Sequence, residues 1–255
     1  MTTHSSLVVP HAGASIVGRC RELNEDAWAA FPNLGVFVVA DGCGARLSGR
    51  PSAHIALQTI ERQLLDGLHP NVEPLASAID EANTQVRLAA VGEHRGDGAT
   101  VAALRLAPPW VVTASVGDCR IYRYRRGYHA SDARADTRGG VLTRITTDDS
   151  LWVHMLKAGA SFDSVKDAYE SHRNVVMQAL GVSERIDLHV QYTKLQSGDL
   201  YLLCSDGVTA QLVDNDIRDC ISDENVALAT RGAQLVRKAD EGVGADNVTA
   251  VLVQC

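Results

Sequence analysis

The sequence lacks the features that would assign it to a membrane, secreted or nucleic-acid-binding class. No apolar run is long enough to span a bilayer, and residues 1–13 have no basic region followed by an apolar stretch, so we expect neither a membrane anchor nor a signal peptide. The formal net charge is −7, and Lys and Arg form no dense block. Because binding to a phosphate backbone needs clustered positive charge, we expect no nucleic-acid partner. Because no apolar run could span a bilayer, we expect no membrane partner.

Paired cysteine motifs are absent as well. None of the six cysteines has C-x-x-C spacing, which argues against a zinc site or thiol redox chemistry. Scattered thiols without a disulfide framework are typical of a reducing compartment. We therefore expect a cytoplasmic protein.

Aromatic residues make up only 5% of the 255 residues, whereas hydrophobic residues make up 45%. Val, Leu, Ile and Ala must therefore fill most of the core, and there is enough of it for one large domain over 1–255. The chain has no internal repeats and no low-complexity linker. A stretch rich in Arg, Asp and Gly at about 125–140 predicts a polar surface loop, and an irregular stretch at about 159–178 predicts a surface flap.

The periodicity of apolar residues predicts a mixed α+β domain. Helical spacing is seen at 51–68, 74–89, 149–158, 214–221 and 225–239, and strand-like runs at 36–40, 100–106, 110–116, 120–124, 200–204 and 248–253. Turns at Pro108-Pro109 and Gly117-Asp118 predict that the three strands between 100 and 124 form an antiparallel meander. This order of elements favours a layered α+β domain over a strict βαβ alternation.

Four short segments that contain aspartate lie in or beside apolar runs. They are Asn24-Glu25-Asp26, Asp41-Gly42, Asp206-Gly207 and Asp246-Asn247. A carboxylate at the end of a buried strand is costly unless it is neutralised, and a cluster of hard divalent cations would neutralise all four. In each Asp-Gly pair the glycine allows a sharp turn close to a ligand. A single Asp-Gly pair is better explained as an ordinary turn. Two matched pairs, together with the other two aspartate segments, favour a metal site.

Seven stretches, in this order, resemble the metal-dependent protein phosphatases of the PPM family, the type-2C serine/threonine phosphatases. They are GRCRELNED at 18–26, VVADGCG at 38–44, GAT at 98–100, SVGDCRIY at 115–122, LTRITTDDS at 142–150, GDLYLLCSDG at 198–207 and DNVT at 246–249. They cover nearly the whole chain. The resemblance implies a central antiparallel β-sandwich flanked by helix pairs on both faces, that is, α-β-β-α layers.

The resemblance also implies a core site for two Mn²⁺ or Mg²⁺ ions. Asp41 would bridge the two ions, with the carbonyl of Gly42 as an extra ligand. Asp206 and Asp246 would complete the core.

Further residues are implied around this core. Asp26 and Glu25 would hold metal-bound water, and Asp118 lies where bacterial members place a ligand of a third, weaker metal. Arg21 occupies the family's phosphate-binding position, where a planar guanidinium suits two phosphate oxygens at once. Arg19 is the alternative phosphate ligand.

The activity implied is hydrolysis of phosphoserine and phosphothreonine in proteins by a metal-bridging hydroxide that attacks phosphorus in line. Two cations about 3.5–4 Å apart would lower the pKa of the bridging water and offset the charge on the phosphate. A stand-alone catalytic domain of this length is similar to bacterial members that oppose serine/threonine kinases. Two alternatives stay open: a pseudophosphatase that binds phosphoproteins without turnover, and an enzyme of the same fold that acts on a small phosphorylated molecule.

Two departures from the family pattern affect substrate handling rather than the ligands. Cys43 stands where family members often have histidine or methionine, so the general acid is unassigned. Asp149 stands in place of the usual histidine of a Thr-x-Asp-His-Ser form. A thiol beside a metal centre could act as a redox switch, but we favour a small buried residue that fills space.

Overall fold

The computed structural model describes residues 9–43, 52–66, 73–90, 97–127, 140–162, 166, 172, 175–242, 244 and 246–255. Most of the predicted polar loop, residues 128–139, lies outside these ranges. The same holds for residues 163–165, 167–171 and 173–174 of the predicted flap.

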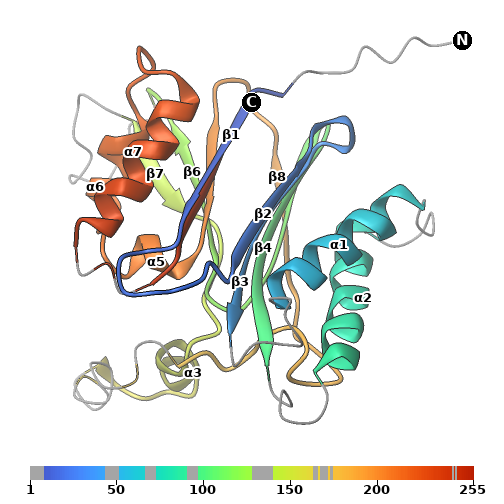
Figure 1. Cartoon of the computed structure of the whole chain (residues 1–255). Coiled ribbons are helices and arrows are strands. Elements are labelled where there is room, and N and C mark those ends of the chain that lie inside the picture. Colours follow the sequence, from blue (N-terminus) through green and yellow to red (C-terminus); the bar gives the residue numbers. More distant parts are fainter. Residues whose placement is uncertain are drawn as a thin grey trace, which may run out of the picture.

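Two antiparallel sheets of five strands each form the centre of the molecule (Figure 1). The first sheet has the order β1 (His11–Ile16), β10 (Val248–Gln254), β9 (Leu200–Cys204), β6 (Arg120–Arg125) and β7 (Val141–Arg144). The second has the order β2 (Asp26–Phe31), β3 (Val36–Cys43), β4 (Gly98–Ala107), β5 (Trp110–Val116) and β8 (His189–Lys194). The first and last strands of the chain, β1 and β10, are thus neighbours in the first sheet.

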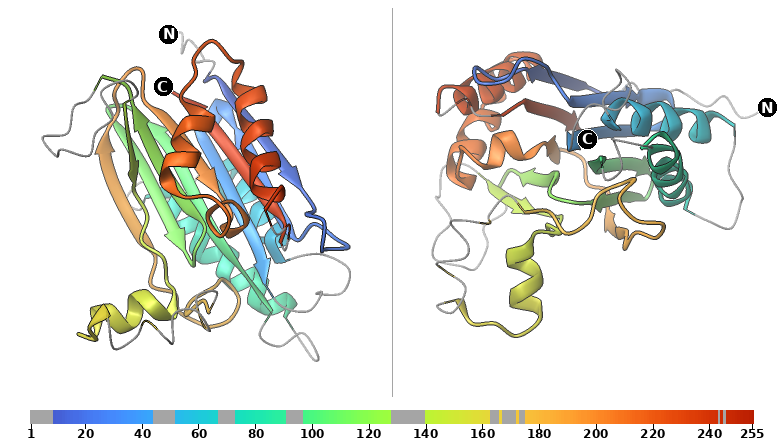
Figure 2. Two further views of the ribbon diagram at one scale, coloured as in Figure 1. Left: turned by 90° about the vertical axis from the view of Figure 1, so that its left-hand side faces the viewer. Right: turned by 60° about the horizontal axis from the view of Figure 1, so that its bottom comes forward.

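Helices cover the outer face of each sheet (Figures 1 and 2). The second sheet carries α1 (Ser52–Leu65) and α2 (Pro74–Ala89), and the first sheet carries α5 (Asp206–Thr209), α6 (Asp214–Ile221) and α7 (Leu228–Asp240). The short helix α3 (Leu151–Lys157) lies at one end of the sandwich, and a 3-10 turn (Pro32–Leu34) joins β2 to β3. Within the described ranges, no helix is both long and apolar enough to cross a membrane.

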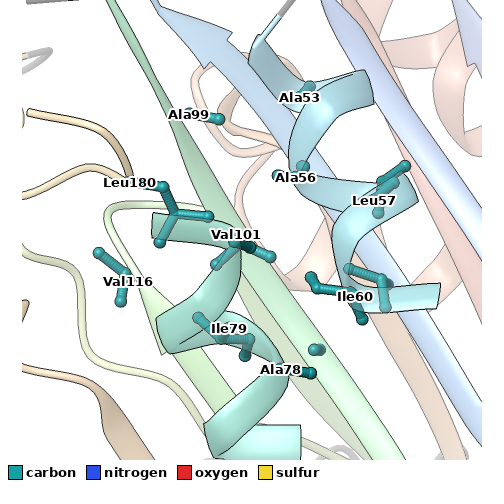
Figure 3. Packing of buried hydrophobic residues seen from close by; sticks show 14 of the residues in the cluster. Ala53, Ala56, Leu57, Ile60, Ala78, Ile79, Ala99, Val101, Val116 and Leu180 are labelled. Carbon is teal, nitrogen blue, oxygen red and sulfur yellow. The ribbon is translucent and has the colours of Figure 1, made fainter. Parts of the chain in front are cut away.

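Three apolar layers hold this arrangement together. One lies between the α1–α2 pair and the second sheet, where Ile60, Ile79 and Val101 pack against each other (Figure 3). Another lies between the two sheets and includes Phe37 and Tyr201. The third lies between the first sheet and the helices α5 to α7. The layers are therefore α-β-β-α, and the predicted fold class is confirmed.

The continuous apolar runs of the central strands follow from burial on both faces. Along β3, Val36, Val38 and Ala40 face the helices, whereas Phe37 and Val39 face the other sheet. Side chains of a strand alternate between its two faces, so a strand buried on both faces can carry apolar residues at consecutive positions. The same alternation is seen in β9.

The predicted meander is wrong in its last step. β4 and β5 pair as expected, but β5 pairs next with β8, and β6 pairs with β9 and β7 in the other sheet. The turn at Gly117-Asp118 therefore carries the chain from one sheet to the other instead of closing a hairpin. Strands β1, β2, β7 and β8 were not predicted, because most of their residues are only half-buried and their apolar pattern is weak.

Candidate active site

The site begins with two carboxylates that face each other across neighbouring strands. Asp26, the first residue of β2, lies opposite Asp41 of β3. Because Phe37 and Val39 point between the two sheets, the alternation along β3 points Asp41 the same way. Residues directly opposite in an antiparallel pair share a face, so Asp26 points there too. Both carboxylates therefore lie at one end of the space between the sheets.

The other two aspartates reach the same place from the opposite sheet. Asp206 follows β9 at the start of α5, and Asp246 lies two residues before the start of β10. A Cβ atom on Gly207 would lie 2.0 Å from the backbone oxygen of Asn247, far inside van der Waals contact. Only glycine allows the two backbones to come this close, and their approach brings Asp206 near Asp246.

A buried serine joins the two sheets at this end. The hydroxyl of Ser205 donates a hydrogen bond to Oδ2 of Asp26 (2.7 Å), and the backbone N–H of Thr249 donates to Ser205 Oγ (3.1 Å). Oδ1 of Asp26 is also buried, and among the described residues nothing donates a hydrogen bond to it. A buried carboxylate oxygen without a donor is a place where a cation would compensate the negative charge.

Asn247 fastens the loop between β1 and β2 to this cluster. Its Oδ1 accepts a hydrogen bond from the backbone N–H of Glu25 (2.8 Å), and its Nδ2 donates to the carbonyl oxygens of Leu23 (2.8 Å) and Val17 (2.5 Å). The side chain of Asn247 is almost fully buried. It therefore fixes the position of Glu25 and of the loop that carries the two candidate arginines.

The structure separates the two candidate phosphate ligands. Nη2 of Arg21 forms an ion pair with Oδ1 of Asp246 (2.9 Å), so this guanidinium lies at the carboxylate cluster. Arg19 turns away and donates hydrogen bonds to the carbonyl oxygens of Asp240 and Gly242 at the end of α7. A cation at Asp246 would have to share this carboxylate with Arg21 or displace the guanidinium.

Burial and mutual repulsion raise the pKa values of the clustered carboxyl groups. Burial raises the pKa of Asp41 well above its ordinary value, and the charges of Asp26, Asp206, Asp118 and Asp246 raise it further. Burial is also the main reason why the pKa of Asp26 rises from 3.8 to about 6.

Asp118 and Asp206 show the same trend. Burial, followed by the charges of Asp206 and Asp148, raises the pKa of Asp118 from 3.8 to about 7. Burial and the charge of Asp246 raise the pKa of Asp206. Four carboxyl groups with raised pKa values, together with the neighbouring charge of Asp246, form a region of surplus negative charge that suits divalent cations.

The carboxylates lie near one another, but their side chains do not yet have the arrangement of a metal coordination shell. In the part of the chain that the structure describes, no three acidic, histidine or cysteine side chains already have the mutual spacing of a formed metal site. Asp41 and Asp118 keep part of their surface exposed, although neighbouring atoms surround most of each carboxyl group. Arg21 occupies one oxygen of Asp246, so this carboxylate is the one proposed ligand that is paired with a cationic side chain in the described structure.

Comparison with known proteins agrees with this arrangement. The family model described as protein phosphatase 2C matches residues 19–242. The chain belongs to the protein phosphatase 2C family. These enzymes are the PPM serine/threonine phosphatases, so the predicted family is confirmed.

Individual relatives cover almost the full length of this phosphatase. The serine/threonine phosphatase stp of Listeria welshimeri is 29% identical over an alignment of 248 residues that covers 93% of this chain and 92% of the relative. The PPM phosphatase MsPP of Mycobacterium smegmatis, solved in complex with cacodylate, has a TM-score of 0.80 at 26% identity, with 97% of this chain and 98% of that chain covered. The catalytic domain of the phosphatase PstP, solved with two manganese ions, has a TM-score of 0.76 at 25% identity, with 97% and 98% covered.

Two details of this phosphatase correct the sequence prediction. β3 continues through Asp41 and Gly42 to Cys43, so Gly42 does not form a sharp turn. Its role is close approach instead, because a Cβ atom there would lie 3.0 Å from the carbonyl oxygen of Glu25. Cys43 as a whole residue is exposed, so it does not fill space in the core as predicted. Its sulfur atom is nevertheless partly shielded from water, and this desolvation and the charge of Asp118 raise the pKa of the thiol. A raised pKa disfavours the reactive thiolate.

The sequence analysis missed an ion-pair network beside Asp118. Arg120 donates to both oxygens of Asp148 (2.8 Å from Nη2 to Oδ2), and Arg144 also forms an ion pair with Asp148. Asp148 is buried, and two arginines neutralise it, so it acts as a structural anchor between β6 and β7. The motif around 142–150 contained Asp148 and Arg144, but only the pairing of β6 with β7 shows that they meet Arg120.

Proposed function

We propose that this chain hydrolyses phosphoserine and phosphothreonine in proteins with the help of two Mn²⁺ or Mg²⁺ ions. Asp41, Asp206 and Asp246 would hold the two ions, with the carbonyl oxygen of Gly42 as an additional ligand. The observation that carries this proposal is the gathering of Asp26, Asp41, Asp206 and Asp246 at one end of the space between the sheets, where burial and neighbouring charges raise the pKa values of Asp41 and Asp206. Such a cluster is unfavourable on its own, and hard divalent cations with oxygen ligands offset its charge.

Three further acidic residues lie around the core in this proposal. Asp26 and Glu25 lie beside Asp41, on β2 and immediately before it, and would bind the ions through water. Asp118 would hold a third, weaker ion together with Asp206, since the charge of Asp206 raises the pKa of Asp118. When bound, two such cations lower the pKa of water and offset the negative charge of a phosphate group.

Arg21 would bind the phosphate of the substrate. Its guanidinium lies at Asp246, and its positive charge partly counters the rise that burial causes in the pKa of Asp206. It is about half exposed and can therefore meet an incoming phosphate, whereas Arg19 is engaged with the end of α7. A planar guanidinium donates to two phosphate oxygens at once and orients the phosphorus atom.

The proposed partners are phosphorylated proteins and an opposing serine/threonine kinase. The Listeria relative is named as a serine/threonine phosphatase, and it matches this chain over nearly its full length. The match to a solved catalytic domain over 97% of this chain supports one catalytic unit over 1–255. None of the six cysteines forms a disulfide, which supports a reducing, cytoplasmic location.

The test is hydrolysis of a phosphothreonine peptide with Mn²⁺ by wild-type protein, Asp41→Asn and Asp206→Asn. We expect each variant to lose at least about 100-fold in kcat/KM, because it removes a proposed direct ligand. Asp216→Asn is the matched control, since Asp216 is an exposed carboxylate paired with Lys238 on the outer helices. Near wild-type turnover in both site variants would refute the two-metal mechanism.

The same assay separates the two alternatives. A pseudophosphatase would hold the phosphopeptide without releasing phosphate, and no observation in the structure or among the relatives favours it. An enzyme for small phosphorylated molecules would turn over p-nitrophenyl phosphate but not phosphopeptides. We expect Mn²⁺-dependent phosphate release from phosphothreonine peptides.

A further inference from the structure

A buried carboxylate outside the proposed ligand set holds the turn that carries Asp118. Oδ2 of Asp149 accepts a hydrogen bond from the backbone N–H of Gly117 (2.9 Å), and the backbone N–H of Asp149 donates to the carbonyl oxygen of Gly117 (2.9 Å). Asp149 is 8% exposed. The two reciprocal bonds fix residue 117 directly before the proposed ligand Asp118.

The conformation of this turn has little freedom. Gly117 has a positive φ of 94°, and a Cβ atom there would lie 2.4 Å from Cγ2 of Thr100. The turn also carries the chain from β5 in one sheet to β6 in the other, so its geometry sets where Asp118 lies relative to Asp206. The direction of Asp118 therefore depends on the partner that holds Gly117.

A histidine from the edge strand β8 completes the arrangement. Nε2 of His189 lies 2.7 Å from Oδ1 of Asp149, and only about a quarter of the His189 side chain is exposed. A buried carboxylate needs donors for both oxygens, and Gly117 and His189 supply them. The family pattern has a histidine at position 149, so in this chain the imidazole comes from β8 and the carboxylate stands where the histidine is usual.

The backbone of the same residue also meets the end of the predicted flap. The backbone N–H of Met177 donates to the carbonyl oxygen of Asp149 (2.6 Å), and the N–H of Leu151 donates to the carbonyl oxygen of Val175 (2.9 Å). Asp149 thus joins three segments that are far apart in the sequence: the turn before Asp118, the strand β8 and the described segment at 175–177.

We infer that Asp149 and His189 are positioning residues that hold the Gly117–Asp118 turn and thereby set the affinity of the cation site at Asp118. The inference rests on the proposed function, in which Asp118 and Asp206 hold a third, weaker ion. In the described part of the chain, the side-chain hydrogen bonds of Asp149 and His189 go to Gly117 and to each other and not to Asp41, Asp206 or Asp246, so loss of the pair acts on the weakest cation site first. A second-sphere contact of this kind affects metal affinity by about 10–100-fold.

The test is Mn²⁺ binding by calorimetry in the absence of substrate, on wild-type protein and four variants. His189→Ala removes the imidazole donor, and His189→Gln keeps an N–H donor on the side chain. Asp118→Asn removes the proposed ligand itself. His154→Ala is the control, because His154 is an exposed histidine on the neighbouring helix α3.

We expect His189→Ala to weaken the weakest Mn²⁺ site about 10–100-fold and to leave the tighter sites unchanged. His189→Gln should stay within about threefold of wild type, because the donor to Asp149 is kept. In the peptide assay, His189→Ala should need a higher Mn²⁺ concentration for half-maximal activity, with little change in KM for the peptide.

Three results would overturn the inference. The first is wild-type binding at every site in His189→Ala while Asp118→Asn has lost the weakest site. The second is an equal loss at all sites in His189→Ala together with a lower melting temperature, which would show a general structural role. The third is a wild-type protein with no third site. If Asp118→Asn binds like wild type while Asp41→Asn abolishes turnover, the role of Asp118 is wrong but the phosphatase proposal stands.

Discussion

Replacing Asp118 by asparagine should stabilise the metal-stripped protein at neutral pH while it weakens cation binding. The folded structure raises the pKa of Asp118 from 3.8 to about 7, chiefly through burial and then through the charges of Asp206 and Asp148. The difference of about three pH units corresponds to about 4 kcal/mol between the protonated and ionised forms. Above pH 7 the ionised carboxylate therefore opposes folding.

The sign of the pH dependence follows from the proton balance. Below pH 3.8 Asp118 is protonated in both the folded and the unfolded state, and its ionisation costs nothing. Between pH 3.8 and about 7 the unfolded chain releases the proton, whereas the folded chain keeps it. The free energy of unfolding of the chelated protein should therefore fall as the pH rises through this range. The pKa of Asp26, raised to about 6, adds in the same direction.

The assay is urea unfolding in excess EDTA at several pH values from 4.5 to 8. We expect Asp118→Asn to raise the free energy of unfolding at pH 7.5 by about 1–3 kcal/mol, less than the full 4 because the neutral amide is still buried. At pH 4.5 the difference should be about 3 kcal/mol smaller, so the variant should no longer be more stable than wild type. With saturating Mn²⁺ the wild type should regain the stability that it loses on chelation. A variant that is no more stable than wild type at pH 7.5 in EDTA would refute the reasoning.

Three further changes test other parts of the site. Asn247→Ala removes the bonds to Glu25, Leu23 and Val17, so we expect a loss of about 2–4 kcal/mol in urea unfolding and a higher KM for the phosphopeptide, whereas unchanged values would contradict the anchoring role. Gly207→Ala places a Cβ atom 2.0 Å from the oxygen of Asn247, so it should cost roughly 3 kcal/mol and raise the Mn²⁺ requirement; a wild-type Mn²⁺ titration would argue against the close approach. Because the pKa of the Cys43 thiol is raised, peroxide should inactivate wild type and Cys43→Ser equally, and selective protection of the serine variant would establish a redox switch.

Much of the fold could be predicted from local periodicity. Helices α1, α2, α6 and α7 and strands β3, β4, β5, β9 and β10 lie where the spacing of apolar residues placed them. These elements are strongly patterned because they bury one stripe of a helix or both faces of a strand. The edge strands β1, β2, β7 and β8 are weakly patterned. The pairing partners of β6 could not be predicted, because pairing is decided by contacts between distant segments.

The sequence by itself determined the chemistry of this protein. Aspartates beside glycine or asparagine, in or next to apolar runs, favour cations that bind oxygen ligands. Seven motifs also occur in the order of one family. Only the tertiary structure decided which groups meet. The register of β2 on β3 sets Asp26 against Asp41, and the turn between the sheets brings Asp149 to Gly117 and His189. In these examples the contacts join residues up to 40 positions apart in the sequence. They are fixed by strand register and by the close approach of backbones, and not by local propensity.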